Sequence, residues 1–510
     1  MSETRFEFDG ITYDVESQSR RGVTLAISRD GAGLERLTVD LYDLRSRTEA
    51  LEALNAVDKD VPWFEHLRNL AVNVKAGNGV SPNGVQDASS MPLAACADWP
   101  SDASDEAFHG LAGDIVRTLE PHTESDPHAL LTISLVAFGN SVGPEPHFRV
   151  GQDEHGLRLN AVLVGPTGHG RKGMSQAEIT SLFERADPDF RKRVITGLSS
   201  GEGLIWAVRD PIYKQEPIKE KGHVVGYQEV QVDAGVDDKR LLVVEPEFAR
   251  TLKAIRREGN ILSAVIRQAW DSGNLRTLTR NNPAVATGAH ISIIGHITPT
   301  EIRRYLDSTE AANGFGNRIL WVAVRRSQFL PEGGSAPEAD LDQIAKRLAD
   351  ALSFAATAKE IRRDAEARDI WHAVYPTLSQ GKPGLVGAAT GRAEAQVMRL
   401  ASIYALMEQS TVIGAPHLVA ALAFWERGEA TARYIFGDAT GDSVADTILR
   451  ELRARGPLTQ TAIYSDIFSR HVSAERIARA LGLLVEFDLV ESKTVETEGR
   501  PATVWSAKQS

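Results

Sequence analysis

Hydrophobic and polar residues alternate in the first forty positions, the pattern of half-buried β-strands. The alternation covers residues 5–8, 11–15, 23–27 and 37–41. Helical periodicity follows over two further segments, and the chain then becomes rich in Gly, Ser, Asn, Pro and Asp; the helical segments are 44–56 and 62–74, and the biased stretch is 76–105. The pattern predicts a small N-terminal α+β domain over residues 1–78 and a linker over 79–105.

From about residue 157 to 324, short apolar segments alternate with helical ones, which is typical of a wound α/β sheet. The predicted strands are 159–164, 193–196, 241–244, 291–295 and 319–324. Asp126 followed by Pro127 predicts the start of an apolar helix that runs to about Phe138. The polar stretch 214–239 is a flexible insertion or a hairpin. We expect the core to span residues 106–335.

Beyond residue 335 the periodicity becomes helical, over 341–356, 362–375 and 392–407, and predicts a helical lid over residues 336–436. The last seventy residues follow the plan of a winged helix over residues 441–510, with three helices and then two strands around 496–501; the helices are 443–455, 459–468 and 473–487. The expected fold class is therefore α/β, with a wound core, a helical lid, a small N-terminal α+β domain and a C-terminal winged helix.

Composition excludes several classes of protein. Hydrophobic residues make up 42% of the 510 positions and charged residues 25%, which are ordinary globular values. The single cysteine, Cys96, excludes an internal disulfide and fits a reducing cytoplasm. The most apolar run, 129–138, is far too short to cross a bilayer, so we expect a cytoplasmic protein without a membrane partner. A net charge of −12 excludes a uniformly basic coat but not a local basic stripe.

Residues 165–175 read Gly-Pro-Thr-Gly-His-Gly-Arg-Lys-Gly-Met-Ser, between a predicted strand and a predicted helix. A phosphate-binding P-loop has this order, because backbone N–H groups and a helix N-terminus converge on one anion. Arg171 departs from the usual spacing, which places Lys directly after the last glycine. Either Lys172 reaches the phosphates from a longer loop and Ser175 serves Mg²⁺, or the loop is only a turn. The candidate ATP-binding residues are Gly165, Thr167, Gly168, Gly170, Arg171, Lys172, Gly173, Met174 and Ser175.

Two carboxylates follow a buried strand at 241–244, namely Glu245 and Glu247. A P-loop enzyme needs one carboxylate at such a strand end for the magnesium and another for the attacking water. The alternative is an ordinary strand that runs into an exposed acidic turn. Glu202, in the glycine-bracketed segment 199–203, is a water-activating base or a helix cap.

Three further residues fit the sensing of phosphate or the neutralisation of its charge. His296 and Thr298 follow the predicted strand 291–295, where they can hydrogen-bond a phosphate or its water; a lone histidine there is also commonly structural. Arg318 precedes another strand on a glycine-flanked turn. It is either an arginine finger, meaning an arginine that reaches a neighbouring subunit's nucleotide, or part of a salt bridge.

Arg476 and Arg479 lie three residues apart on the third helix of the predicted winged helix. They share a face, as the arginines of a DNA-recognition helix do. Winged helices also serve as protein-binding modules, so this pair predicts either a nucleic-acid or a protein contact.

At these motifs the chain resembles a family of helicase-like P-loop proteins of plasmids, phages and integrated elements. The resemblance covers residues 99–436 and lies in Gly-Pro-Thr and Arg-Lys-Gly-Met-Ser within 165–175, Gly-Leu-Ser-Ser-Gly-Glu-Gly-Leu at 197–204, Val-Glu-Pro-Glu-Phe at 244–248, Glu-Gly-Asn at 258–260, Ala-Trp-Asp-Ser-Gly at 269–273, Gly-His-Ile-Thr at 295–298 and Asn-Gly-Phe-Gly-Asn-Arg at 313–318. It implies a motor core similar to RecA-like or AAA+ hexameric ATPases, in which the Arg-Lys-Gly loop is the family's own variant.

The resemblance also implies roles for single residues. Lys172 would bind phosphate, Ser175 would bind magnesium, Glu245 and Glu247 would form the acidic pair, His296 would be the sensor and Arg318 the finger. Residues 391–400 resemble the lid segment of minichromosome-maintenance helicases, which makes Arg392 a further nucleotide contact. The first ninety residues resemble no family, and they lack the acidic or zinc-binding residues of a primase.

The resulting expectation is an ATP- and Mg²⁺-dependent hexameric DNA helicase or translocase, a replicative helicase or initiator of a mobile genetic element. It would form a homo-oligomeric ring with single-stranded DNA in the pore, and the insertion at 214–239, with Lys214, Lys219 and Lys221, is a candidate pore loop. The alternatives are an ATP-gated DNA-binding regulator or defence protein without unwinding activity, and an assembly protein with an inactive P-loop.

Overall fold

The computed structural model describes residues 4–8, 11–19, 22–29, 32–39 and 99–508, except 221–222, 279–283, 307–309, 311–312, 383, 438, 441, 488 and 497–500. The chain divides into two compact units, Met1–Ser90 and Met91–Ser510. Each unit is described by itself below.

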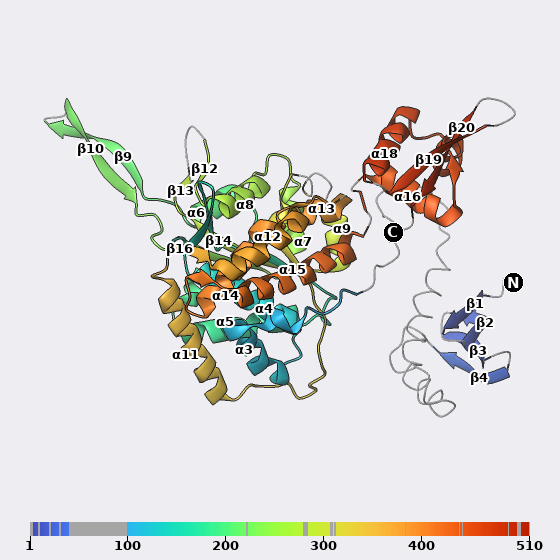
Figure 1. Ribbon diagram of the computed structural model, residues 1–510, viewed down its shortest axis with the longest axis horizontal. Helices are drawn as coiled ribbons and strands as arrows, with labels where there is room; N and C mark the ends of the chain where they lie inside the picture. The colour runs from blue at the N-terminus through green and yellow to red at the C-terminus, as the bar shows by residue number, and fades with distance from the viewer. Residues whose placement is uncertain are drawn as a thin grey trace. The chain divides into compact units, whose positions relative to one another are not determined.

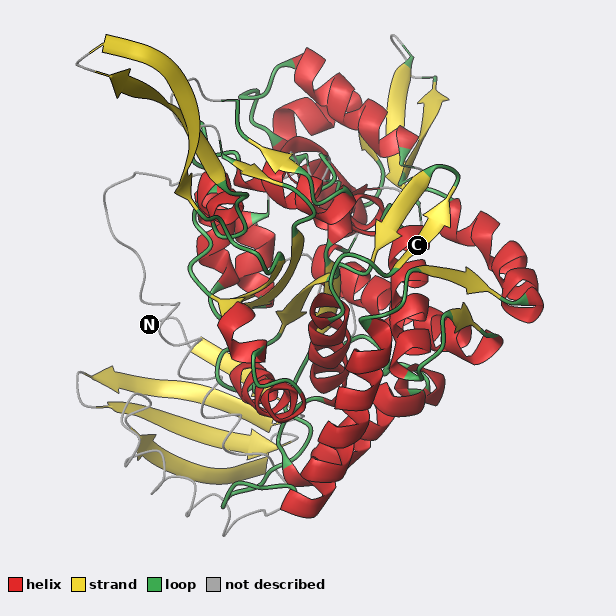
Figure 2. Cartoon of the chain, turned by 90° about the vertical axis from the view of Figure 1, so that its left-hand side faces the viewer, coloured by secondary structure: helices red, strands yellow, loops and turns green. Residues whose placement is uncertain are grey.

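The N-terminal unit contains a four-stranded antiparallel meander, with strand order β1-β2-β3-β4 (Figure 2). Its strands are β1 (Thr4–Phe8), β2 (Ile11–Ser19), β3 (Gly22–Arg29) and β4 (Ala32–Val39). The four strands predicted from alternation are confirmed. The helices predicted over 44–56 and 62–74 lie outside the described residues, as does the predicted linker up to residue 98.

A five-stranded parallel sheet forms the centre of the second unit, with strand order β15-β7-β14-β11-β8. The strands are β7 (Asn160–Val164), β8 (Val194–Ile195), β11 (Arg240–Glu245), β14 (His290–Ile297) and β15 (Leu320–Ala323). All five coincide with predicted strands. Numbered along the chain, the order is 5-1-4-3-2, so the fourth strand separates the first from the third.

Helices cover both faces of this sheet (Figure 1). Alternate residues of β7 enter two hydrophobic clusters: Ala161 and Leu163 pack on the side of α4 and α5, while Val162 contacts the side of α6, α7 and α8. The helices are α4 (Pro127–Ser141), α5 (Lys172–Ala186), α6 (Gly201–Trp206), α7 (Phe248–Ile255) and α8 (Leu262–Asp271). Because β-strand side chains alternate between faces, one apolar strand fills both layers.

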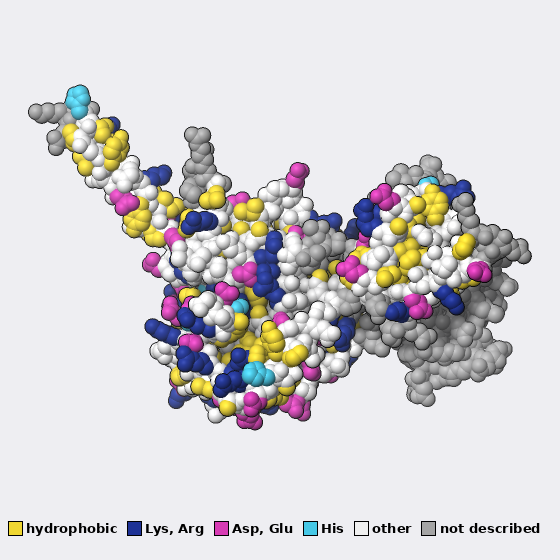
Figure 3. All heavy atoms as spheres, turned by 45° about the horizontal axis from the view of Figure 1, so that its top comes forward, with side chains coloured by type: hydrophobic (Ala, Val, Ile, Leu, Met, Phe, Trp, Pro, Cys, Tyr) yellow, Lys and Arg dark blue, Asp and Glu magenta, His cyan; other side chains and the backbone are white. Residues whose placement is uncertain are grey.

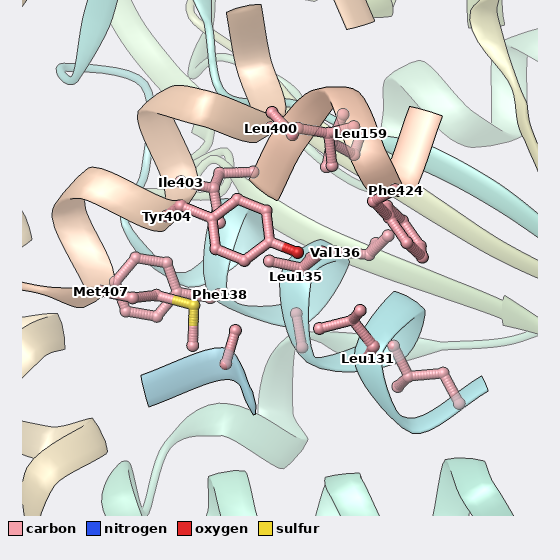
Figure 4. Packing of buried hydrophobic residues seen from close by; sticks show 14 of the residues in the cluster. Leu131, Leu135, Val136, Phe138, Leu159, Leu400, Ile403, Tyr404, Met407 and Phe424 are labelled. Atoms are coloured by element: carbon pink, nitrogen blue, oxygen red, sulfur yellow. The ribbon is translucent and has the colours of Figure 1, made fainter. Parts of the chain in front are cut away.

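Helix α4 is buried on all sides and is the centre of the larger cluster. In Figure 4, Phe138 lies beside Met407 of α14, and the Tyr404 ring of α14 lies near Leu135. As predicted, Asp126 caps α4: its side chain accepts the amide of His128. The surrounding helices are α3 (Gly110–Leu119), α11 (Glu338–Ala355), α14 (Ala393–Met407) and α15 (Ala415–Phe436).

The helix predicted over 362–375 is wrong at its start. Residues Glu360–Arg363 form strand β16, and α12 (Ala365–Ser379) begins only after Asp364, whose side chain accepts the amide of Ala367. The strand belongs to a second sheet, with order β17-β16-β5-β6, that no sequence pattern indicated. Its other strands are β5 (His147–Val150), β6 (Asp153–Gly156) and β17 (Val412–Ile413). Pairing with β5 and β17 prevails over local helical periodicity here.

Strands β9 (Ile212–Glu220) and β10 (His223–Asp233) form an antiparallel hairpin that projects from the second unit (Figure 1). Of the two alternatives for 214–239, the hairpin is therefore confirmed. Hydrophobic side chains lie exposed along it, as Figure 3 shows in yellow; Tyr213, Val225 and Tyr227 are more than half exposed. Shorter elements complete this part, namely β12 (Leu275–Arg276), β13 (Val285–Ala286), α9 (Pro299–Tyr305) and α13 (Gly384–Thr390).

The C-terminal segment forms its own hydrophobic cluster, which includes Ile448, Leu452, Ile477 and Leu481. Its elements are α16 (Ser443–Arg455), β18 (Leu458–Thr459), α17 (Gln460–Ala462), a π-helical turn (Ile463–Ile467), α18 (Ala474–Glu486), β19 (Val490–Val495) and β20 (Ala502–Ala507). The sheet order is β18-β20-β19. The three predicted helices and the two strands after them are confirmed as elements. Within the described residues, every helix is too short or too polar to be a bilayer span.

Candidate nucleotide-binding site

The glycine-rich loop leaves β7 at the carboxyl edge of the parallel sheet and leads into α5, as predicted. Gly165 begins it, and its amide donates to Ile297 O on the neighbouring strand at 3.0 Å. A Cβ at Gly165 would lie 2.3 Å from Val324 O, so the close approach of β15 requires glycine here. The next four residues, 166–169, are exposed. Thr167 and Gly168 are thus accessible to a ligand.

Arg171, the residue that breaks the usual P-loop spacing, has a left-handed backbone with φ of +46°. Its side chain leaves the loop and pairs with Glu124 at 2.5 Å. Glu124 is almost fully buried; it accepts the amide of Leu330 and lies 3.7 Å from Arg326. The amide of Leu330 and the two guanidinium groups lower the pKa of Glu124. The extra residue is therefore accommodated by local strain and a buried anchor.

Lys172 is the first residue of α5, and its ammonium lies over the loop. Nζ donates to Gly165 O at 2.6 Å and to Pro166 O at 3.1 Å. Burial lowers the pKa of Lys172, while the carboxylate of Glu301 acts in the opposite direction. The structure thus places the predicted phosphate-binding lysine at the mouth of the loop, next to the free amides of a helix N-terminus.

Ser175 is fully buried one turn into α5, and its Oγ donates to Arg171 O at 3.2 Å. Gly173 and Met174 are exposed on the same turn, and Gly170 is buried against Pro166 O. The role of Ser175 as a magnesium ligand stays a prediction.

His296 lies at the carboxyl end of β14, in register with Leu163 of the strand that carries the loop. The side chain is 5% exposed, and Nε2 is buried without a hydrogen-bond partner among the described residues. Burial, and then the charge of Lys172, lower the pKa of His296 to about 4. A neutral imidazole with an unsatisfied nitrogen therefore lies beside the loop lysine, and a buried polar atom of this kind requires a partner.

The predicted acidic pair, Glu245 and Glu247, lies farther from the loop than His296 does. Glu245 ends β11, which β14 separates from β7, so two strand spacings, or about 10 Å, lie between it and the loop strand. Its buried carboxylate accepts the amides of Gly197 and Leu198, beside β8. Glu247 is exposed at the N-cap of α7. Both residues lie at the predicted edge of the sheet, and their metal and water roles stay predictions.

Glu202 is exposed in the first turn of α6, where the cap is Ser200, whose Oγ accepts the amide of Gly203. Thr298 also serves as a cap. Its side chain accepts the amide of Glu301, and Glu301 accepts in return from Thr298, which together form a capping box at α9. This box fixes Glu301 near Lys172.

Arg318 lies at the opposite edge of the sheet, directly before β15. It is 6% exposed and forms a two-pronged ion pair with Asp271, from Nε at 3.1 Å and Nη2 at 2.8 Å. Arg392, the predicted lid contact, lies at the same carboxylate, at 3.6 Å. The structure thus brings the two predicted arginines together, away from the loop of their own chain.

Two more arginines, Arg158 and Arg399, are buried in this cluster. The guanidinium of Arg399 stacks on Trp270 at 3.5 Å, and burial lowers the pKa of both arginines. Asp271 is the carboxylate whose charge acts on all four guanidinium groups or pairs with them. The cluster is therefore strongly electropositive.

The two predicted arginines of α18, Arg476 and Arg479, have different surroundings. Arg479 is exposed, whereas Arg476 donates to the Asp442 carboxylate at 2.7 Å. Asp442 caps α16, so Arg476 links two helices.

The described residues also contain a cluster of potential metal ligands, namely His109, Glu408 and His417. Both Nε2 atoms lie within 3.1 Å of the Glu408 carboxylate. The Gly414 amide donates to Nδ1 of His417 at 3.0 Å, so the proton of neutral His417 is on Nε2. A metal-bound histidine normally donates from its second nitrogen, so this cluster fits a hydrogen-bonded carboxylate better than a metal site.

Sequence reasoning missed Glu124, Glu301 and Asp271. Thr-Pro-Thr-Glu at 298–301 has the spacing of a capping box and would have indicated Glu301. Asp271 lies in the motif at 269–273 that carries the resemblance, but no pattern in the sequence indicates the arginine partners of Asp271 or Glu124, because both reach them only through the tertiary fold. Comparison with models of protein families and with curated proteins gives no match for this chain.

Proposed function

We propose that the chain is a P-loop ATPase whose second unit binds ATP with Mg²⁺ at the loop 165–175. The observation that carries the proposal is the unpartnered buried Nε2 of His296 next to the ammonium of Lys172. A terminal phosphate that bonds to Lys172 would supply the acceptor or attacking water that His296 lacks. Such a contact exists only with the triphosphate bound, which is the property of a sensor.

The strand order supports the same proposal. Ligands of open α/β sheets bind outside the carboxyl ends of the strands, where the loop, His296 and Glu245 all lie. The order 5-1-4-3-2 also places β14, which carries His296, directly beside the strand that leads into the loop. The C-terminal order of helices and strands agrees with a winged helix, in which Arg479 remains available for DNA.

The chain would act as a ring of identical subunits that moves along DNA. Arg318 and Arg392 lie at the amino edge of the sheet, whereas the loop lies at its carboxyl edge. The two arginines would therefore contact the nucleotide of a neighbouring subunit. Repetition of such a head-to-tail contact closes a ring. The β9–β10 hairpin, with exposed Tyr227 and Lys214, offers the stacking and charge that a single strand requires.

The first test is ATP binding and hydrolysis by Lys172→Ala and His296→Asn. We expect Lys172→Ala to abolish detectable ATPase activity, and His296→Asn to lower kcat by about 10²-fold while the Kd for ATP changes little. Lys192→Ala is the matched control, since Lys192 is 78% exposed and pairs only with Asp189 among described partners. Wild-type ATPase activity in Lys172→Ala would refute the proposal.

The second test separates a motor from an ATP-gated regulator. Strand displacement on forked DNA is measured beside DNA-stimulated ATPase activity. A motor displaces the strand in an ATP-dependent manner, and the activity falls steeply with salt. DNA-stimulated hydrolysis without displacement would favour the regulator.

A further inference from the structure

A cavity of about 710 Å³ lies away from the loop, between the β5–β6 turn, the end of β16, α12 and the start of α14. This volume is within the range of small-molecule sites. Its wall combines three kinds of side chain: the cations Arg149, Arg363 and Arg392, the aromatic rings of Trp371 and Tyr375, and the polar groups Asn317 and Glu394. Arg149 pairs with Glu154 and Arg392 with Asp271.

The first feature that points to a ligand is the charge of Arg363. Its guanidinium is partly buried over the Trp371 ring, 5.1 Å from the centroid. Among the described residues its one polar contact is Met398 Sδ at 3.9 Å, and no carboxylate pairs with it. The neighbouring Arg362, in contrast, is 74% exposed and paired with Glu360. An uncompensated cation inside a cavity favours an anionic ligand.

The second feature is the combination of flat and polar surfaces. Tyr375 is 47% exposed and lies 5.6 Å from Trp371, so its ring face is available for stacking. Glu394 would repel a phosphate but can accept hydrogen bonds from an exocyclic amine, and the Asn317 amide can bond a ring nitrogen. A cation for phosphate, a ring for stacking and a carboxylate for an amine together match one ligand class.

We propose that this cavity binds a nucleotide unit with an amino-bearing base, its phosphate at Arg363 and Arg149 and its base against Tyr375 and Glu394. The source of the unit is either a free mononucleotide or one nucleotide of a single strand, since both offer the same groups. The cavity shares Arg392 with the proposed contact to a neighbouring subunit's nucleotide, but the proposal does not depend on ATP binding at the loop of the same chain.

The test uses the full chain with Lys172→Ala, so that the loop does not contribute. Calorimetric titration with dAMP is compared between this protein and versions that also carry Arg363→Ala or Arg362→Ala. We expect Arg363→Ala to weaken dAMP binding at least tenfold and Arg362→Ala to leave it unchanged. Tyr375→Ala, at an exposed side chain, should weaken binding about fivefold or more without any risk to the core.

Anisotropy of fluorescein-labelled (dA)10 distinguishes the two sources. If Arg363→Ala lowers the affinity for (dA)10 as much as the affinity for dAMP, the single strand is a ligand of the cavity. If the affinity for (dA)10 is unchanged, the ligand is the free nucleotide. dTMP, which has no exocyclic amine, should bind more weakly than dAMP. Absence of dAMP binding at millimolar concentration, or equal affinities in Arg363→Ala and Arg362→Ala, would overturn the proposal.

Discussion

At the scale of single residues, the unusual spacing of the glycine-rich loop is explained by Arg171 and its partner Glu124. The left-handed backbone of Arg171 absorbs one extra residue, and the ion pair holds its side chain out of the loop. Lys172 can then open α5 with its ammonium over the loop carbonyls. The extra residue therefore leaves Lys172 as the first residue of the helix, with its ammonium over the loop.

We expect Glu124→Gln to weaken ATP binding several-fold, because a neutral amide pairs poorly with Arg171 and leaves the loop less ordered. Titration of ATP into both proteins measures the effect, and Glu332→Gln, an exposed carboxylate, is the control. The pKa of Glu124 is lowered in the folded state, so its contribution to stability is present above the ordinary pKa and is lost as the pH falls through the folded value. An unchanged ATP affinity would show that the anchor does not order the loop.

The lowered pKa of His296, about 4, gives a second prediction about pH. Here the folded state disfavours the protonated form, whereas for Glu124 it favours the ionised form. The unfolded chain binds this proton near pH 6.5, so His296 reduces stability as the pH falls from about 6.5 to about 4. The expected loss is on the order of 2 kcal/mol between pH 7 and pH 5. Histidine ring NMR measures the pKa directly, and bound ATP should raise it, since phosphate charge favours the imidazolium. An unchanged pKa of His296 in the presence of ATP would contradict its proposed role as a phosphate sensor.

At the scale of elements, the sequence predicts what local patterns determine. Apolar runs predicted four strands of the central sheet, because both faces of a parallel sheet are buried. The edge strand β8 offers only Val194 and Ile195, of which Ile195 is exposed. Strand β16 was missed, since Glu360–Arg363 has little hydrophobic character and forms only through pairing with β5 and β17. The candidate site divides in the same way: the loop and His296 follow strands, whereas Glu124 and Asp271 act through contacts between distant segments.

Thr298 has a structural role at the start of α9 that must be separated from its predicted contact with phosphate. Its hydroxyl caps α9 in the capping box with Glu301, so Thr298→Ala should lower the unfolding free energy by about 1 kcal/mol. Thr300→Ala, at an exposed position in the same turn, is the control and should cost much less. Thermal unfolding with and without ATP separates the two roles of Thr298. A capping residue lowers both midpoints equally, while a phosphate contact would mainly lower the ATP-dependent increase.

At the scale of the whole molecule, the proposed ring rests on the distance between the two ends of the parallel strands. Asn160 begins β7 and donates to Arg318 O, while Gly165 follows the other end of the same strand. Five residues of extended chain separate these ends by about 16 Å. Asp271 holds Arg318 and Arg392 together at the amino edge of the sheet. In the proposed ring, another subunit would place its nucleotide there.

Mixing two inactive variants tests this arrangement. Lys172→Ala removes the lysine proposed to bind phosphate. Arg392→Ala removes an arginine that is 38% exposed and therefore less important to the fold than Arg318. Each variant alone should be inactive. In an equimolar mixture, half of the loops come from Arg392→Ala chains and half of their neighbours are Lys172→Ala chains, so about a quarter of the sites combine an intact lysine with an intact arginine. Recovery of about a quarter of the wild-type ATPase activity is expected, and a mixture as inactive as its components would mean that Arg392 does not serve the neighbouring subunit.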